Sequence, residues 1–330
     1  MPKVSVVIPV YGVEKYIERC AISLFEQKLD DIEFIFVDDC TIDRSIEILR
    51  NVIKRYRFRL EEKKYIVRVE KMPVNSGQAI VRKHGTSLAT GDFIIHCDPD
   101  DWIDENMYEI MYNYAINNGY DVVNCDFYRT NCNSFKNRSR KIPEVVYENN
   151  INLLSKMLIG SDLTSLCTKL VRKEIYDKVE FPKYNMQEDA FISFQIFFYA
   201  GKIGHIGKCL YYYYSNPLSI SRNPSVESYL DRLHQVCENT NKIISFACSN
   251  GIYDELYEEI ECQKLRARNH IVPLTSKRKF YKMWRETYPE IDKSILYNNK
   301  IDKKERCQYF LVRFRVYHIL LALFRNRIWK

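Results

Sequence analysis

The chain has 330 residues and a net charge of +7, and 46% of its residues are hydrophobic, which is ordinary for a globular protein. That length fits one sizeable α/β core with a smaller appended region, and the composition excludes a disordered or low-complexity chain. The eleven cysteines show neither a C-x-x-C pair nor the Cys/His spacing of a zinc site, so we expect reduced thiols rather than disulfides or structural zinc.

Short apolar runs alternate with helical patterns over the first half of the chain, which is typical of βαβ units and a largely parallel sheet. The almost continuously apolar run Ile32–Val37 indicates helices on both faces of that sheet. We predict five strands: Val4–Val10, Ile32–Asp38, Tyr65–Lys71, Phe93–Asp98 and Val122–Tyr128. We predict four helices between them: Glu14–Gln27, Ser45–Leu60, Gln78–Ala89 and Glu105–Asn117.

The second half begins with a polar connection and a helix, over residues 130–160. We then predict a strand at Ser165–Val171, a helix at Asp189–Ala200 and an extended aromatic run at Ile203–Tyr214. The loop Ser215–Pro224 either closes over a bound ligand or is a rigid surface connection. From residue 225 onward the pattern is helical, so we divide the chain into an α/β domain of residues 1–224 and a helical region of residues 225–330.

Two acidic clusters follow predicted strands. Asp38 and Asp39 end the second strand, and Asp98, Asp100 and Asp101 follow the fourth. Because ligands bind beyond the carboxyl ends of parallel strands, both clusters are expected at one edge of the sheet. Asp98 and Asp100 project to the same side of an extended backbone and can hold one Mg²⁺ or Mn²⁺ together with a diphosphate. The alternative is a solvated turn that caps the following helix.

The third predicted helix begins after Asn75, Ser76 and Gly77, where free backbone N–H groups could face a phosphate. We expect Asn75, and Arg82 on the helix itself, to contact such an anionic ligand. The alternative is an N-capped surface helix with ordinary basic residues, and we prefer that reading for Lys83 and His84.

These segments together resemble the inverting nucleotide-sugar glycosyltransferases of family 2, which have the GT-A fold. The run Val4–Tyr11 is similar to the family's first strand, and Val37–Asp43 is similar to its V-D-D-x-S-x-D turn. His96–Trp102 matches the family's D-x-D-D-W block. The intervening helix keeps the family's spacing at Asn75, Gly77, Arg82, Gly85, Ala89 and Gly91.

Three later segments extend the resemblance, which covers residues 3–222 and none of the chain from residue 225 onward. The pair Lys169 and Leu170 resembles the family's K-L pair, Gln187–Asp189 stands where the family has its E-D pair, and Tyr211–Ser221 is similar to its Y-Y-Y-R…S-I-S element. The chain departs from the family at three positions: it has Val81, Lys83 and Tyr214 where the family commonly has Ala, Asn and Arg, respectively.

The resemblance implies a metal-dependent enzyme that moves a sugar from a nucleotide-sugar, by default a uridine diphosphate sugar, to a carbohydrate acceptor in cell-surface or capsular polysaccharide synthesis. It implies that Asp39 contacts the nucleotide base, that Asp98 contacts the ribose or the metal, and that Asp100 ligates Mn²⁺ or Mg²⁺. The other donor-binding residues that it implies are Pro9, Tyr11, Glu14, Asn75, Gly77 and Arg82.

An inverting transfer needs a carboxylate on the acceptor side to take the proton of the incoming hydroxyl. Asp189 is our candidate for this base, and Glu188 beside it either raises its pKa by repulsion or orients the acceptor. The alternative for this pair is an acidic helix N-terminus that complements the helix dipole. We expect a single displacement with inversion at the anomeric carbon and no covalent intermediate.

The start of the chain lacks the basic and apolar regions of a secretory signal, and no run approaches the roughly 20 apolar residues that cross a bilayer. We therefore expect a cytoplasmic protein. The basic and aromatic run Tyr309–Leu321 predicts an amphipathic helix that either lies on the inner face of the membrane, which would suit a lipid-linked acceptor, or packs against protein. No nucleic-acid recognition motif occurs.

Two other kinds of function compete with this interpretation. A sugar nucleotidyltransferase would carry a glycine-rich loop after the first strand, where this chain has Pro9–Val13, and a dehydrogenase would carry G-x-G-x-x-G. A catalytically inactive scaffold that binds nucleotide-sugar or partner enzymes would not need Asp98, Asp100 and Asp189 together.

Overall fold

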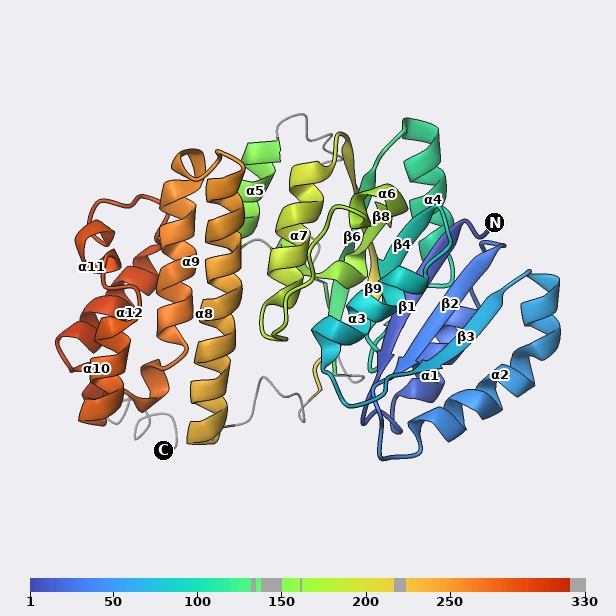
Figure 1. Cartoon of the computed structure of the whole chain (residues 1–330), viewed down its shortest axis with the longest axis horizontal. Helices are drawn as coiled ribbons and strands as arrows, with labels where there is room; N and C mark the ends of the chain where they lie inside the picture. The colour runs from blue at the N-terminus through green and yellow to red at the C-terminus, as the bar shows by residue number, and fades with distance from the viewer. Residues whose placement is uncertain (132–134, 138–149, 161, 217–223, 321–330) are drawn as a thin grey trace. The chain divides into compact units, whose positions relative to one another are not determined.

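A computed structural model describes residues 1–131, 135–137, 150–160, 162–216 and 224–320. Contacts divide the chain into two units, Met1–Leu153 with Leu163–Pro217 and Leu154–Asp162 with Leu218–Lys330. The first unit contains the sheet and the second is helical (Figure 1). Residues 217–223 lie outside the described residues, and they hold most of the loop Ser215–Pro224, for which the sequence left open closure over a ligand or a rigid surface connection.

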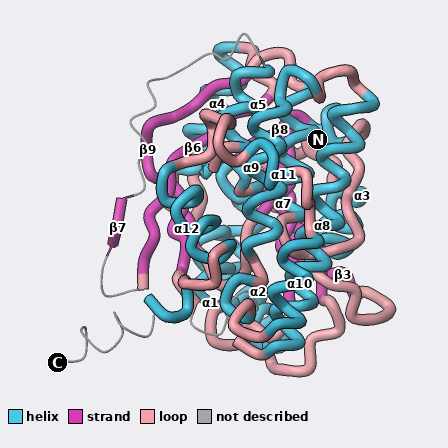
Figure 2. The backbone as a smooth tube through the Cα atoms, turned by 90° about the vertical axis from the view of Figure 1, so that its left-hand side faces the viewer, coloured by secondary structure: helices cyan, strands magenta, loops and turns pink. Residues whose placement is uncertain are grey.

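The described strands of the first unit are β1 (Val4–Val10), β2 (Ile32–Asp38), β3 (Ile66–Lys71), β4 (Phe93–His96), β5 (Trp102–Ile103), β6 (Val122–Thr130), β7 (Phe135–Asn137), β8 (Lys169–Arg172) and β9 (Ile203–Tyr214). They form one sheet in the order β3-β2-β1-β4-β8-β6-β9-β5, with β7 paired to β6. The pairs β3–β2, β2–β1, β1–β4 and β6–β9 are parallel, and β6 and β9 run side by side along all of β6 (Figure 2). This arrangement confirms the predicted α/β class with a mostly parallel sheet.

Helices cover both faces of the sheet because side chains of a strand point alternately to its two sides. Val6 and Ile8 pack on one side with apolar residues of α1 and α4, whereas Val7 meets α3 on the other side. A Cβ at Gly85 would lie 2.5 Å from Val7 Cγ1, so α3 can approach β1 this closely only with glycine there. The helices of this unit are α1 (Ile17–Phe25), α2 (Ser45–Glu62), α3 (Gln78–Leu88), α4 (Met107–Asn118), the start of α5 (Asn150–Leu158), α6 (Lys173–Tyr176) and α7 (Glu188–Tyr199).

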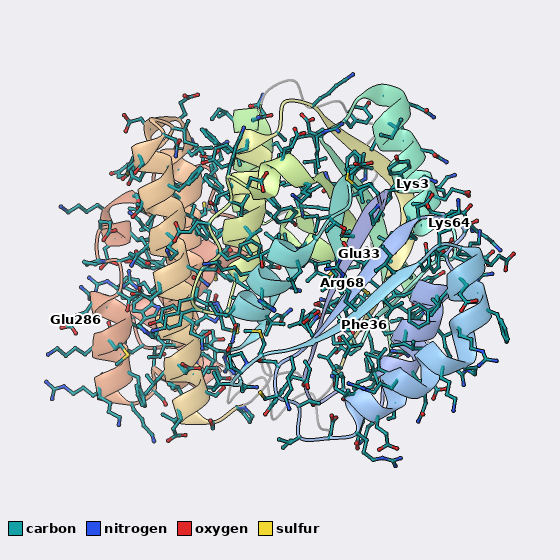
Figure 3. The ribbon with its side chains drawn as sticks, turned by 45° about the vertical axis from the view of Figure 1, so that its right-hand side comes forward. Lys3, Glu33, Phe36, Lys64, Arg68 and Glu286 are labelled. Carbon is teal, nitrogen blue, oxygen red and sulfur yellow. The ribbon has the colours of Figure 1, made fainter. Side chains whose placement is uncertain are left out.

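A buried carboxylate near the beginning of β2 joins the neighbouring strands. Glu33 accepts hydrogen bonds from Ser5 Oγ at 2.6 Å and from the backbone N–H of Thr90 at 2.8 Å. Arg68 of β3 forms an ion pair with it at 3.0 Å (Figure 3). These partners offset the cost of burying a charge, and they join β2 to β1 and β3 at the edge opposite to the carboxyl ends of the parallel strands.

The predicted element bounds agree with the structure most closely where apolar periodicity is strong. β1, β2 and β9 coincide with their predicted ranges. The strand predicted at Phe93–Asp98 ends at His96. The strand predicted at Ser165–Val171 begins only at Lys169, because Ser165 Oγ accepts the backbone N–H of Cys167 and starts a short 3₁₀ turn.

The helical unit contains the end of α5, α8 (Val226–Ser249), α9 (Tyr257–Asn269), α10 (Arg278–Glu286), α11 (Ile291–Ser294) and α12 (Lys303–Arg313). Its core surrounds Trp284, whose ring lies 3.8 Å from the guanidinium carbon of the fully buried Arg268. Arg268 also donates to Asp292 at 2.7 Å. No helix among the described residues is long and apolar enough to cross a membrane.

The single amphipathic helix predicted at Tyr309–Leu321 is wrong. Helix α12 ends at Arg313, and the backbone reverses at Arg315, which has a left-handed φ of 62°. Tyr309 and Val312 belong to the core of the helical unit, so this part of the run packs against protein. Leu321 lies outside the described residues.

Candidate active site

The loops after β1 and β2 are tied together by Asp43. Its carboxylate accepts the Thr41 and Ser45 hydroxyls and the backbone N–H of Glu14 at 2.6 to 2.9 Å. Burial alone would raise the pKa of Asp43, but these hydrogen bonds hold it below its ordinary value. This network fixes the loop that carries two of the implied donor residues, Tyr11 and Glu14, which are exposed. A third, Pro9, is buried within β1.

Asp39 joins the end of β2 to the start of α3. Its two carboxylate oxygens accept the backbone N–H groups of Ser76 at 2.7 Å and Gly77 at 2.9 Å, and Asn75 Nδ2 donates to the Asp39 carbonyl at 3.0 Å. The expectation that these N–H groups are free to face a phosphate is therefore wrong, because a carboxylate of the chain already occupies them. The contacts implied for Asp39, Asn75 and Gly77 with a donor remain predictions.

The same helix start is also held by Asn185, from the segment before α7. Asn185 Oδ1 accepts the backbone N–H of Ala79 at 3.0 Å. A Cβ at Gly77 would lie 2.6 Å from Asn185 Nδ2, and Gly77 has a φ of +82°, so both space and backbone conformation require glycine there. The α3 helix thus brings the acidic end of β2 next to the segment that leads to the candidate base.

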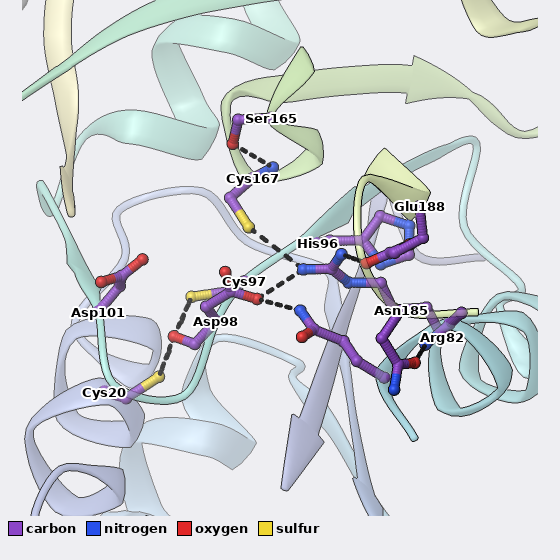
Figure 4. A network of polar contacts seen from close by, with 12 residues as sticks. Cys20, Arg82, His96, Cys97, Asp98, Asp101, Ser165, Cys167, Asn185 and Glu188 are labelled. Atoms are coloured by element: carbon purple, nitrogen blue, oxygen red, sulfur yellow. Dashed lines mark hydrogen bonds and ion pairs between the residues drawn. The ribbon is translucent and has the colours of Figure 1, made fainter. Parts of the chain in front are cut away.

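Arg82 bridges the two acidic groups that were predicted to serve donor and acceptor. Its side chain is only 3% exposed. One guanidinium nitrogen donates to Asp98 Oδ1 at 2.6 Å, and another donates to Glu188 Oε1 (Figure 4). The residues after β4 and those at the start of α7 therefore meet at one guanidinium, with both carboxylates hydrogen-bonded to it.

The carboxylates of α7 lie in an environment that weakens their acidity. Burial raises the pKa of Glu188 to about 7, although the Arg82 guanidinium opposes that rise. Burial likewise raises the pKa of Asp189, against the attraction of Arg82 and Lys169. A carboxylate with a raised pKa is a stronger base than an exposed one, so burial makes Asp189 a better proton acceptor than an exposed aspartate.

Lys169 contributes a buried amine to this site. Its side chain is inaccessible to solvent, and Nζ donates to the Ser165 carbonyl at 2.5 Å and lies 5.2 Å from the ring centre of Phe197. Burial lowers the pKa of Lys169 to about 7, and Asp189 is the strongest influence in the opposite direction. Lys169 and Asp189 therefore favour each other's charged forms.

The acidic turn after β4 divides into residues with different surroundings. Asp101 is buried and accepts the Tyr211 hydroxyl and the Tyr214 backbone N–H, each at 2.6 Å, so it anchors the turn to β9. Asp100 accepts Asn216 Nδ2 at 3.1 Å. Burial, and then the nearby Asp98 carboxylate, raise the pKa of Asp100. A cation beside Asp98 and Asp100 would offset this repulsion.

The chemistry of Asp98 and Asp100 fits a hard divalent cation such as Mg²⁺ or Mn²⁺, which prefers oxygen ligands. Among the described residues, no group of three or more His, Cys, Asp or Glu side chains could hold a metal ion. The contacts predicted for Asp98 and Asp100 with a metal ion remain predictions.

One residue of the site was not singled out from the sequence: Asn185 has no motif of its own, since it acts on α3, which is remote along the chain. Asp101 and Tyr211 were noted only as members of longer segments, and the sequence did not show that they bond to each other. Lys169 was noted only as part of a family pair. An apolar strand that contains one lysine was the sole sequence signal for its burial.

Comparisons with known proteins identify the family to which the chain belongs. A model of glycosyl transferase family 2 matches residues 5–180. A relative from Bacillus subtilis (strain 168), the uncharacterized glycosyltransferase EpsJ, is 28% identical over 251 residues, which are 71% of this chain and 68% of that protein.

Two solved structures show the same fold at low identity. S. aureus TarS in complex with UDP-GlcNAc is 20% identical, with a TM-score of 0.57 over 85% of this chain and 83% of that one. The mannosyltransferase PcManGT from Pyrobaculum calidifontis, in complex with GDP-Man and Mn²⁺, is 12% identical, with a TM-score of 0.56 over 96% of this chain and 87% of that one. Because the family model spans more than half of the chain, including β1 to β4 and β8, this protein belongs to glycosyl transferase family 2 and is a glycosyltransferase of the GT-A type.

Proposed function

We propose that the protein is a metal-dependent inverting glycosyltransferase that moves a sugar from a uridine diphosphate sugar to a carbohydrate acceptor. The observation that carries this proposal is the Arg82 bridge, which brings Asp98 after β4 and Glu188 at the start of α7 into one site. The UDP-GlcNAc bound to TarS supports the choice of nucleotide, and the Mn²⁺ bound to PcManGT supports the metal. The family resemblance favours a role in the synthesis of a cell-surface polysaccharide. The transfer itself would take place in the cytoplasm.

In this proposal Asp98 and Asp100 hold Mn²⁺ or Mg²⁺, which when bound neutralises charge on the diphosphate leaving group. Asp189 accepts the proton of the acceptor hydroxyl as that oxygen attacks the anomeric carbon. Lys169 and Arg82 favour the ionised form of Asp189 before the attack. Glu188, held by Arg82, positions the acceptor side of the site rather than acting as the base.

The test is release of uridine diphosphate from a panel of nucleotide-sugars in the presence of carbohydrate acceptors. We expect turnover that is lost on chelation, restored by Mn²⁺ or Mg²⁺, and lowered by about 1,000-fold or more in Asp100→Ala and Asp189→Ala. Glu105→Ala is the control, because Glu105 forms only an exposed ion pair with Lys28 and should leave the rate unchanged.

The product and the binding data distinguish the remaining alternatives. Product NMR should show inversion at the anomeric carbon, and retention would overturn the single-displacement mechanism. Tight binding of nucleotide-sugar without turnover in any acceptor mixture would instead support an inactive scaffold.

A further inference from the structure

The N-terminal half of α10 in the helical unit is an exposed cationic segment. Lys277, Arg278, Lys279 and Lys282 are exposed, whereas Phe280 faces the core. Lys282 pairs with Glu286 at 3.7 Å, but Lys277, Arg278 and Lys279 form no ion pair within the described part of the chain. Their charge is therefore not neutralised by a carboxylate of the described residues.

The segment that follows α12 exposes large apolar side chains. Phe314 is 71% exposed, Val316 is 37% exposed and Ile319 is 59% exposed. Burying such side chains against a partner is favourable by roughly 25 cal/mol for each Å² of apolar surface removed from water. Three of them within six residues form a concentration of exposed apolar surface that the core of this unit does not cover.

Hydrogen bonds and a cation–π contact join these two segments. Tyr281 of α10 donates its hydroxyl to the Arg313 carbonyl at 2.9 Å, and the Arg315 guanidinium carbon lies 4.9 Å from the Tyr281 ring centre. Just before α10, Thr275 Oγ1 lies 3.0 Å from His318 Nε2, and the Ser276 carbonyl accepts from Arg315 at 3.4 Å. We call this the basic–apolar surface: Lys277, Arg278, Lys279, Lys282, Phe314, Arg315, Val316 and Ile319.

We propose that the basic–apolar surface docks on an anionic phospholipid bilayer. Cations near an anionic bilayer are attracted to its surface charge, and apolar side chains beside them insert into the interface between headgroups and acyl chains. The two segments in contact supply both kinds of side chain. A nucleic acid or another acidic polymer would use the cations but would leave Phe314 and Ile319 exposed to water. This docking is independent of the proposed transfer reaction, although it would suit a lipid-linked acceptor.

A second exposed basic row in the chain provides a matched control. On α2, Arg50, Lys54 and Arg57 are exposed and form no ion pair among the described residues. This basic row on α2 lies beside one exposed apolar side chain, Phe58, which is 69% exposed, and α2 has no other large apolar side chain that is exposed. Reversing three charges there changes the net charge by the same amount as reversing Lys277, Arg278 and Lys279.

The experiment is flotation of the full chain with vesicles of phosphatidylglycerol and phosphatidylcholine, compared with phosphatidylcholine alone, in the absence of any sugar donor. We expect binding to the anionic vesicles only, weakened by about tenfold or more in the triple variant Lys277→Glu, Arg278→Glu, Lys279→Glu. The control variant Arg50→Glu, Lys54→Glu, Arg57→Glu should bind within about twofold of the wild type. Phe314→Ser with Ile319→Ser should weaken binding at high salt, where apolar contacts dominate. Circular dichroism verifies that each variant is folded.

Three outcomes would overturn the proposal. They are no flotation of the wild type with anionic vesicles, an equal loss in the α2 control, and full retention of vesicle binding in both surface variants. Binding of the wild type to soluble polyphosphate but not to vesicles would assign the surface to an acidic polymer instead. Because no donor is present, none of these results depends on whether the proposed reaction is correct.

Discussion

Arg82 is the residue on which the two halves of the site depend. It lies on α3, yet its partners Asp98 and Glu188 are 16 and 106 residues away along the chain. Removing one partner of a buried ion pair leaves an uncompensated charge, which typically costs about 3–5 kcal/mol. The contacts of Arg82 with Asp98 and Glu188 are therefore expected to affect the stability of the fold as well as catalysis.

Arg82→Met tests both consequences. We expect the free energy of unfolding, measured with urea, to fall by about 3–5 kcal/mol, because Glu188 and Asp98 lose their shared cation. Adding Glu188→Gln to this variant should recover part of the loss, since one buried charge is then removed. A loss below about 1 kcal/mol would contradict the burial and pairing described for Arg82.

Lys169 gives the site a pH dependence with a definite sign. Its pKa is lowered to about 7 in the folded protein, below its ordinary value in an unfolded chain. Between about pH 7 and about pH 10 the unfolded chain therefore binds a proton that the folded protein does not, so the free energy of unfolding rises with pH through this lysine.

Lys169→Met should remove this contribution. The difference in free energy of unfolding between wild type and variant, measured with urea, is expected to shift in favour of the wild type as the pH rises from about 7 to about 10. The exposed Lys83→Met on α3 is the control and should show no such trend. A pH-independent difference for Lys169→Met would contradict a lowered lysine pKa.

At the scale of elements, the position of α3 against β1 and β2 decides where the site residues meet. The helix start is held by Asp39 from β2 and by Asn185 from the segment before α7. Its middle approaches β1 at Gly85, with no room for a Cβ beside Val7. Displacing α3 would move Arg82 relative to both of its carboxylates.

Gly85→Ala tests this close packing. We expect it to lower the free energy of unfolding by about 1–3 kcal/mol, even though alanine favours helices, because the new methyl group would overlap Val7. Val7→Ala in the same chain should restore part of the stability by making room. Increased stability of Gly85→Ala in a thermal melt would show that α3 lies farther from β1 than described.

At the scale of the whole molecule, the chain does not pass from one unit to the other at a single point. Residues Leu154–Asp162 group with the C-terminal helices although they precede β8. Ser155 donates to Glu259 at 2.5 Å, and the Leu158 carbonyl accepts from Gln263 at 2.6 Å and from Arg266 at 2.8 Å. The second half of α5 is therefore hydrogen-bonded to α9. Helix α5 ends at Leu158 and α9 begins at Tyr257, 99 residues later along the chain.

A chain cut after residue 224 should therefore be less stable than the full chain. Removing α9 would remove the groups that donate to the Leu158 carbonyl and the acceptor of the Ser155 hydroxyl. We expect a lower melting temperature and aggregation of residues 1–224 in light scattering. An equal melting temperature and a monomeric state would show that the sheet-containing unit folds without the helical one.

The sequence by itself determined the mostly parallel sheet and the acidic strand ends, because apolar periodicity and the bounds of strands such as β1 and β2 are local properties of the chain. Only the tertiary structure decided the partners of those acidic residues. Asp39 accepts backbone N–H groups of α3, Asp101 anchors β9, and Arg82 joins Asp98 to Glu188. Local patterns cannot predict such pairs, since each depends on how closely distant segments pack and on which side chains are buried together.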